Sequence, residues 1–240
     1  MLKITHNGSL DNYTDGEVYL LRHHVYGGNA FNVYNTSNIT FSNIKLYAIA
    51  GMGWLIESRT ERFLLLNCVI GLDPERDDNR VSATADGVHI ANTNGKFKIS
   101  GCDFSFMGDD DVNVAKVTNR LNDKTVEIYT NANNFAAGDT AIFSSKGFDD
   151  LNFSATVMSV DGSKLTFDKE LPDYIAKDCI VSNGSIDSGN YVISDNNFHE
   201  NRARGLLLQS NNGLCENNRF YMTMANPIKV IMDISSGLWL

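Results

Sequence analysis

The sequence predicts an all-β protein: a parallel β-helix that carries one inserted, small antiparallel β-barrel. Three observations lead to this fold class. Short apolar segments recur at intervals of about two dozen residues, apolar and polar side chains alternate within them, and Asn, Gly, Ser and Asp separate them. Period-2 alternation is typical of strands, and self-similarity at this interval is typical of stacked coils.

The first set of repeats consists of five hexapeptides that superpose on one another. They occupy residues 41–46, 65–70, 99–104, 193–198 and 215–220. Their last residues are Leu46, Ile70, Phe104, Phe198 and Phe220, which are separated by 24, 34, 94 and 22 positions. We expect these residues to form one column in which each coil buries its apolar side chains against the next.

A second set of tripeptides keeps step with the first. Their first residues are Phe31, Trp54, Val88, Val112, Leu206 and Ile228, with separations of 23, 34, 24, 94 and 22 positions. The two long intervals therefore mark insertions between coils. The 34-residue interval has room for a polar surface loop at residues 73–80.

The 94-residue interval predicts a second structural unit. It holds about seventy additional residues rich in alternating β-branched side chains, which argues against a long disordered loop. Strand-like runs lie at 125–129, 140–143, 155–160, 164–167 and 179–181. We therefore expect residues 1–115 and 185–240 to form the β-helix and residues 116–184 to form the inserted barrel.

Composition limits the classes of partner. Twenty Lys and Arg residues against 29 Asp and Glu residues give a net charge of -9, whereas nucleic-acid binders neutralise phosphates with basic residues. The chain has no run of 18 or more apolar residues, and its first eight residues lack the features of a signal peptide. We expect a soluble chain without a targeting signal, with neither nucleic acid nor membrane as a partner. The four cysteines have no metal-ligand spacing, which favours buried thiols.

The register of the repeat brings acidic residues together. Two positions before the second set of tripeptides the sequence reads Met52, Asp86, Asp110, Arg204 and Asn226. Because neighbouring parallel strands lie roughly 4.8 Å apart, we expect Asp86 and Asp110 to be first neighbours, with Arg204 one coil further. Asp109 precedes this pair at the turn. Asp111 falls in a column where the other coils have Gly53, Gly87 and Gly205.

The next column places His89 and Asn113 beside the acids. Carboxyl groups this close do not all ionise easily, so we expect one of them to have a raised pKa and to act as an acid near neutral pH. Cleavage of a glycosidic bond requires one carboxylic acid that protonates the leaving oxygen and one carboxylate that activates water or attacks the sugar. The column therefore predicts a carbohydrate-cleaving enzyme.

Several motifs in the chain resemble glycoside hydrolase family 110, the exo-acting α-1,3-galactosidases. The similarity extends from about Leu20 to the C-terminus and includes the inserted barrel. The motifs that carry it occupy residues 26–30, 51–55, 80–89, 109–114 and 201–210. Their order and spacing make the resemblance more specific than any single motif.

The resemblance implies a right-handed β-helix that removes terminal α-1,3-linked galactose with inversion and without a metal or other cofactor. It implies that the catalytic aspartates are Asp86, Asp109 and Asp110. The candidate substrate-binding residues are Arg204, Arg202, His89, Asn113, Glu200 and Arg80. The partner would be a galactose-terminated oligosaccharide or glycoconjugate, and the location would be secreted or periplasmic.

The chain departs from the family pattern after the acids. Asn113-Val-Ala-Lys116 stands where the family has a His-Gly dipeptide, and Asp111 replaces a small neutral residue. Family members are also longer, so we expect a segment of a larger enzyme or a shortened relative. Uncapped coil ends expose strand edges and apolar interiors, which predicts self-association.

Three other kinds of function share these features. An Asp-rich turn can bind Ca²⁺ through its oxygens, as in a calcium-dependent polysaccharide lyase or adhesin. A glycan-binding β-helix would use the acids only to bind sugar hydroxyls. A hydrolase similar to polygalacturonases would share the fold and an aspartate triad, but its anionic substrate would favour a more basic chain than this one.

Overall fold

The computed structural model describes residues 7, 8, 14, 16, 17, 26–76, 80–108, 117–129, 132–147, 149–210 and 212–230. Within these residues the regular structure consists of β-strands and one 3₁₀ turn, Ala132–Asn134, so the chain is nearly all-β as predicted. No helix in the described part of the chain is long and apolar enough to cross a membrane.

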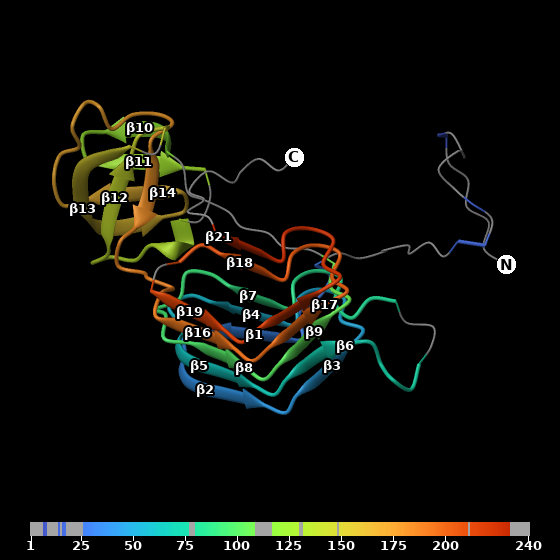
Figure 1. The fold of residues 1–240 in the computed structure, drawn as a ribbon. Helices are drawn as coiled ribbons and strands as arrows, with labels where there is room; N and C mark the ends of the chain where they lie inside the picture. Colours follow the sequence, from blue (N-terminus) through green and yellow to red (C-terminus); the bar gives the residue numbers. More distant parts are fainter. Residues whose placement is uncertain are drawn as a thin grey trace.

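Fifteen strands belong to parallel sheets, which is consistent with a β-helix (Figure 1). Those before the inserted segment are β1 (Phe31–Tyr34), β2 (Ser37–Ser42), β3 (Lys45–Tyr47), β4 (Trp54–Glu57), β5 (Glu61–Leu66), β6 (Val69–Gly71), β7 (Val88–Ile90), β8 (Lys98–Ser100) and β9 (Asp103–Ser105). Those after it are β16 (Tyr191–Ser194), β17 (Asn197–His199), β18 (Leu206–Leu208), β19 (Gly213–Glu216), β20 (Arg219–Tyr221) and β21 (Ile228–Val230).

In two of the parallel sheets, each of the five successive coils contributes one strand. The strand orders are β2-β5-β8-β16-β19, β3-β6-β9-β17-β20 and β1-β4-β7, with β18 paired to β21 in a further sheet. Strands β8 and β9 pair directly with β16 and β17, across the inserted segment. The coils before and after the insertion are therefore direct neighbours in the stack.

The predicted column of the hexapeptides is present in full. Ile70 pairs with Leu46 and with Phe104, and Phe198 pairs with Phe104 and with Phe220. In the second column Trp54 pairs with Phe31 and Val88, and Leu206 pairs with Ile228. Val112, the predicted member between Val88 and Leu206, lies outside the described residues.

The corner between the first two sheets explains the asparagines of the repeat. One residue of each coil has a positive φ there: Asn43 (56°), Asn67 (54°), Gly101 (67°), Asp195 (59°) and Asn217 (56°). Gly adopts this left-handed conformation freely, and Asn and Asp adopt it at lower cost than other residues. The asparagines among these residues have the turn-forming role predicted for them.

Aromatic stacks fill the interior of the coils. Phe104, Phe198 and Phe220 stack with centroid separations of 5.3 and 5.1 Å. Phe97 stacks on Phe63 at 4.9 Å and on Tyr191 at 5.1 Å. Burying one such ring stabilises the fold by about 1.5–3 kcal/mol, and offset stacking adds to this. Cys68 and Cys102 are buried in the same interior and Cys179 is buried in the antiparallel sheet, as predicted, but Cys215 is exposed, so the prediction of four buried thiols is wrong for this residue. Burial raises the pKa of the Cys102 thiol to about 11.

Six strands between Val117 and Asn183 form an antiparallel sheet in the order β10-β11-β14-β13-β12-β15. They are β10 (Val117–Asn122), β11 (Thr125–Ile128), β12 (Thr140–Ser144), β13 (Asp150–Asp161), β14 (Lys164–Phe167) and β15 (Ile180–Asn183). The five predicted strand-like runs coincide with β11 to β15, and β10 was not predicted. Figure 1 shows these strands gathered apart from the parallel ones.

The antiparallel sheet has its own apolar core, which includes Phe143, Val157 and Leu165. The amide of Val117 donates to Cys179 O at 2.8 Å and the amide of Asp178 donates to Val117 O at 2.9 Å, linking β10 to the segment before β15. Closure into a barrel, the handedness of the coils, the domain boundaries and self-association stay predictions.

Candidate active site at the corner before strand β7

Asp86 lies at the corner that leads into β7, where the backbone is fixed by the preceding coil. The amide of Gly53 donates to Asp86 O at 3.0 Å, and the amide of Trp54 donates to Gly87 O at 2.9 Å. Ala83 forms isolated parallel bridges with Ile49 on one side and Met107 on the other. The position of Asp86 is therefore set by three successive coils.

The glycine column beside Asp86 reflects close approach of the coils. A Cβ atom at Gly53 would lie 2.4 Å from Gly87 O, and one at Gly87 would lie 2.3 Å from Met107 Sδ. At Gly205 the nearest atoms would be Phe220 Cδ1 at 2.6 Å and Pro227 O at 2.8 Å. At Gly53 and Gly205 a backbone oxygen blocks a Cβ atom, whereas at Gly87 the Met107 side chain would have to move. Asp111, the predicted exception in this column, lies outside the described residues.

The carboxylate of Asp86 is buried and contacts a histidine. Asp86 Oδ2 lies 2.9 Å from His89 Nδ1, and the two side chains are 10% and 16% exposed. A protonated Nδ1 donates a charge-assisted hydrogen bond to the carboxylate in this geometry. His89 thus lies beside the acid, as its column predicted, and orients it directly.

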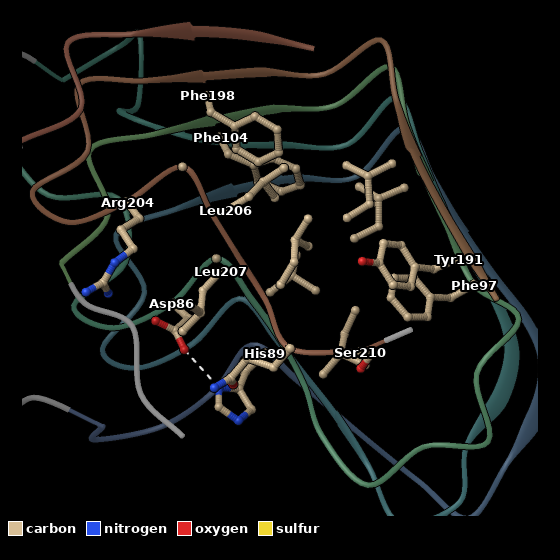
Figure 2. A pocket seen from close by; sticks show the side chains of 18 of the residues that line it. Asp86, His89, Phe97, Phe104, Tyr191, Phe198, Arg204, Leu206, Leu207 and Ser210 are labelled. Atoms are coloured by element: carbon tan, nitrogen blue, oxygen red, sulfur yellow. Dashed lines mark hydrogen bonds and ion pairs between the residues drawn. The ribbon is translucent and has the colours of Figure 1, made fainter. Parts of the chain in front are cut away.

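A cavity of about 180 Å³ opens between β7 and β18. Asp86, His89 and Arg204 line it together with apolar side chains of the coil interior (Figure 2). The aromatic part of its wall consists of Phe97, Phe104, Tyr191 and Phe198. The charged groups thus lie at one end of the space, and the rest of its lining is mostly apolar with a few polar side chains such as Tyr191 and Ser210. The predicted strand at residues 112–114 would run between β7 and β18, and it lies outside the described residues.

The polar groups of the lining include Arg204 and the phenol of Tyr191. Arg204 lies on the same side of the cavity as Asp86 in Figure 2. Burial, followed by the proximity of Cys215, raises the pKa of Tyr191, so this phenol is neutral at neutral pH and can donate a hydrogen bond. The structure thus places Asp86, His89 and Arg204 around one space, while Asp109, Asp110 and Asn113 lie outside the described residues.

Three predicted substrate-binding residues do not line this cavity as described. Arg202 Nη1 donates to Gly108 O at 2.8 Å. Glu200 Oε2 lies 2.9 Å from His199 Nδ1, and Arg80 is an exposed residue. Arg202 and Glu200 therefore have protein partners, and a sugar contact from either stays a prediction.

The sequence did not reveal two arrangements near the site. Buried Asn201 accepts a hydrogen bond from the amide of Met107, and only its place at the end of the coil repeat could have suggested this. His199 Nε2 lies 3.0 Å from Asp103 Oδ1, so this imidazole joins two carboxylates on the outer surface. In the described part of the chain, no three His, Cys, Asp or Glu side chains are placed to hold a metal ion.

Comparison with known proteins gives two distant relatives, each named alpha-1,3-galactosidase A. The Shewanella woodyi protein is 25% identical over 222 residues, which are 84% of this chain and 35% of the relative. The Bacteroides fragilis protein is 25% identical over 224 residues, 85% of this chain and 36% of the relative. The chain thus spans about a third of the length of these relatives. No protein-family model matches it.

Proposed function

We propose that the chain carries the active site of a glycoside hydrolase that removes terminal α-1,3-linked galactose from glycans. The observation that carries this proposal is the Asp86–His89 pair at the charged end of a cavity that Arg204 also lines. The names of the two distant relatives support the same substrate class. A galactose-terminated oligosaccharide or glycoconjugate is the proposed partner.

Asp86 is the proposed general base. Its carboxylate lies 2.9 Å from His89 Nδ1, which can hold it in place through a hydrogen bond. An ionised carboxylate removes a proton from water as the water attacks the anomeric carbon. His89 is the residue that holds the carboxylate in the orientation for this step.

Asp109 and Asp110, which follow Gly108 in the sequence, are the proposed partners of Asp86. One of them, as a neutral carboxylic acid, protonates the glycosidic oxygen as the bond to the leaving sugar breaks. Arg204 would bind sugar hydroxyls, with Asn113, Arg80 and Glu200 as further proposed contacts. No metal or other cofactor takes part in this scheme.

Inversion is part of the proposal because the sequence motifs resemble a family of inverting enzymes. An inverting pair needs carboxyl groups about 6.5–9.5 Å apart, which leaves room for one water molecule. Acids on neighbouring coils are closer if they face each other directly, at roughly the 4.8 Å strand spacing. We therefore propose Asp86 with Asp109, at the turn, as the wider pair.

The scaffold of this site is a proposed right-handed β-helix made of residues 1–115 and 185–240. Residues 116–184 are the proposed inserted barrel, and the hydrogen bonds between Val117 and residues 178 and 179 support its closure. In this arrangement the catalytic column belongs entirely to the stacked coils.

The test is Asp86→Asn, with Asp103→Asn as the matched control. Both acids contact a histidine, at 2.9 and 3.0 Å, but Asp103 faces the outer surface. We expect Asp86→Asn to lower the rate of galactose release from an α-1,3-galactoside by about 10²- to 10⁴-fold, since it removes the proton acceptor. The control should retain the rate, and circular dichroism should show both variants folded.

Release of no sugar by the unaltered protein from a panel of α-galactosides, together with glycan binding, would contradict the hydrolase and favour a binding module. Activity that is lost with EDTA and restored by Ca²⁺ would favour a lyase. An equal fall in the rate of galactose release in Asp86→Asn and Asp103→Asn would contradict a catalytic role for Asp86.

A further inference from the structure

The corner that follows β9 is held by two residues of the next coil. Asn201 is 1% exposed and reaches back to the preceding coil with its side-chain amide. Its Oδ1 accepts a hydrogen bond from Met107 N at 3.2 Å, and its Nδ2 donates to Phe104 O at 3.3 Å. The amide thus ties both sides of the corner to the coil above it.

Arg202 adds two hydrogen bonds at the same place. Its backbone amide donates to Met107 O at 3.1 Å, and its Nη1 donates to Gly108 O at 2.8 Å. Gly108 N in turn donates to Ala85 O at 3.4 Å, next to Asp86. Consecutive peptide groups from Met107 to Gly108 are therefore held from the following coil and from the preceding one.

The same asparagine arrangement occurs at the corner between β8 and β9, where none of the proposed catalytic acids lies. Asn196 Oδ1 accepts from Cys102 N at 2.9 Å, and Asn196 Nδ2 donates to Ile99 O at 3.0 Å. Both Asn196 and Asn201 reach residues 94 and 97 positions earlier. The arginine that follows Asn201 has no equivalent after Asn196, where Asn197 stands. The asparagine is thus a general device of the coil, and the arginine is an addition at this corner.

We propose that Asn201 and Arg202 are positioning residues for galactoside hydrolysis, an inference that rests on the proposed function. They fix the backbone up to Gly108, from which the chain continues directly into the proposed catalytic Asp109 and Asp110. Catalytic groups must be held within about 0.5 Å of the productive geometry, and a misplacement of about 1 Å costs about 100-fold in rate. The guanidinium of Arg202 therefore acts on the proposed acids through the carbonyl of Gly108.

This role differs from the sugar contact that the sequence suggested for Arg202. An arginine that binds the sugar equally in the ground state and the transition state changes KM when it is removed. An arginine that holds the catalytic backbone changes kcat and leaves KM almost unaltered. The two roles therefore separate in steady-state kinetics.

The experiment uses two variants. Arg202→Met keeps a long unbranched side chain but removes the donor to Gly108 O, and Arg202→Lys restores a donor. Because Arg202 is an exposed residue, these variants should fold. We expect kcat on an α-1,3-galactoside to fall about 10- to 100-fold in Arg202→Met, with KM within about twofold, and to recover partly in Arg202→Lys. Hydrogen–deuterium exchange should be faster in the peptide that contains Met107 and Gly108.

Asn201→Ala and Asn196→Ala form the matched pair. Each removes a buried amide that bonds one backbone N–H and one carbonyl of the preceding coil, and Asn196 also donates to Asn218 Oδ1 at 2.9 Å. Both substitutions should therefore lower the melting temperature, but only Asn201→Ala should lower kcat of the folded protein. Equal losses of kcat in this pair, or a rise in KM alone in Arg202→Met, would overturn the positioning role while the proposed function stands. An unaltered protein without galactosidase activity would overturn both.

Discussion

The parallel coils and the antiparallel sheet both bury apolar strands, but they differ in the sequence separation of the strands that pair. In the coils Phe104 pairs with Phe198, a residue 94 positions later. In the antiparallel sheet β13 and β14 pair through a hairpin in which Asp161 faces Lys164. The coils therefore depend on register between distant segments, whereas the sheet depends on turns between adjacent ones.

This difference explains why a long insertion is tolerated. The insertion leaves the stack at one corner and returns at the neighbouring coil, so β8 still pairs with β16 and β9 with β17. Lengthening a connection costs little free energy when its two ends stay close together. Strands that pair between neighbouring coils can thus be separated in sequence by a folded unit, whereas the two strands of a hairpin need a short turn between them.

The two regions are joined by an ion pair as well as by the chain. Arg59, which follows β4, contacts the carboxylate of Asp139, which precedes β12. Asp139 is 6% exposed and also accepts hydrogen bonds from Ala136 N at 2.7 Å and Asn183 Nδ2 at 2.8 Å. One buried carboxylate therefore anchors the antiparallel sheet to a corner of the coils.

The largest expected contrast between the regions comes from their aromatic cores. Phe198 is 4% exposed and lies between Phe104 and Phe220, whereas Phe143 is fully buried against Phe153 and Phe167. Each Phe→Ala change should cost about 3–5 kcal/mol of unfolding free energy because it leaves a cavity. We expect only Phe198→Ala to reduce galactoside hydrolysis, since the proposed site belongs to the coils.

Calorimetry and activity measured on the same samples test this contrast. If the two regions are separate cooperative units, Phe143→Ala should lower the midpoint temperature of one thermal transition and leave that of the other unchanged. A single transition shifted equally by both substitutions would show that the coils and the sheet unfold together. Loss of activity in folded Phe143→Ala would show that the sheet contributes to the site.

The junction gives the second contrast, through Asp139→Asn. Burial raises the pKa of Asp139, but hydrogen bonds from Ala136, Asn183 and Arg59 outweigh this and bring the pKa below its ordinary value. The substitution leaves a partly buried guanidinium without its carboxylate, and we expect a loss of about 2–3 kcal/mol at pH 7. Urea unfolding of both proteins gives the difference.

The pH dependence of this loss has a definite sign. Because the pKa of Asp139 is lowered by folding, its contribution is present above the ordinary carboxyl pKa of about 3.9 and is lost as the pH falls through the folded-state value. The difference between wild type and Asp139→Asn should therefore shrink below about pH 4. The control is Asp168→Asn within the sheet, where an exposed acid has its pKa lowered first by Thr156 N–H, and its effect should be smaller. If the difference in unfolding free energy did not change with pH, the Arg59–Asp139 ion pair would not be its cause.

The coils were more predictable from sequence than the sheet because the register of their strands follows from the spacing of the repeated segments. Leu46, Ile70 and Phe104 could be aligned by counting, and they pair as expected. Strand β10 could not be recognised because its sequence, VTNRLN, is mostly polar and exposed. Antiparallel pairing leaves no repeat to count, so the strands of the sheet were predicted but their order was not.

The site was predictable only in part, for a related reason. Spacing brings Asp86, His89 and Arg204 to one corner, and the structure places them around one cavity. Spacing does not reveal which side chain receives which hydrogen bond, so the bond from Arg202 to Gly108 O was not anticipated. Such contacts depend on side-chain torsions that a repeat pattern leaves open.

The smallest expected contrast compares two glycines with positive φ, Gly101 at a corner of the coils (67°) and Gly162 in the hairpin of the sheet (56°). A methyl group at Gly162 meets no atom within 4 Å, so Gly162→Ala should cost only the backbone strain, about 1 kcal/mol. At Gly101 the added Cβ would lie 2.4 Å from Asn67 Oδ1 on the neighbouring coil, and this amide must move away. We therefore expect Gly101→Ala to cost about 1–2 kcal/mol, more than its counterpart, in urea unfolding. Equal costs would mean that contact between coils adds nothing to the strain of the corner itself.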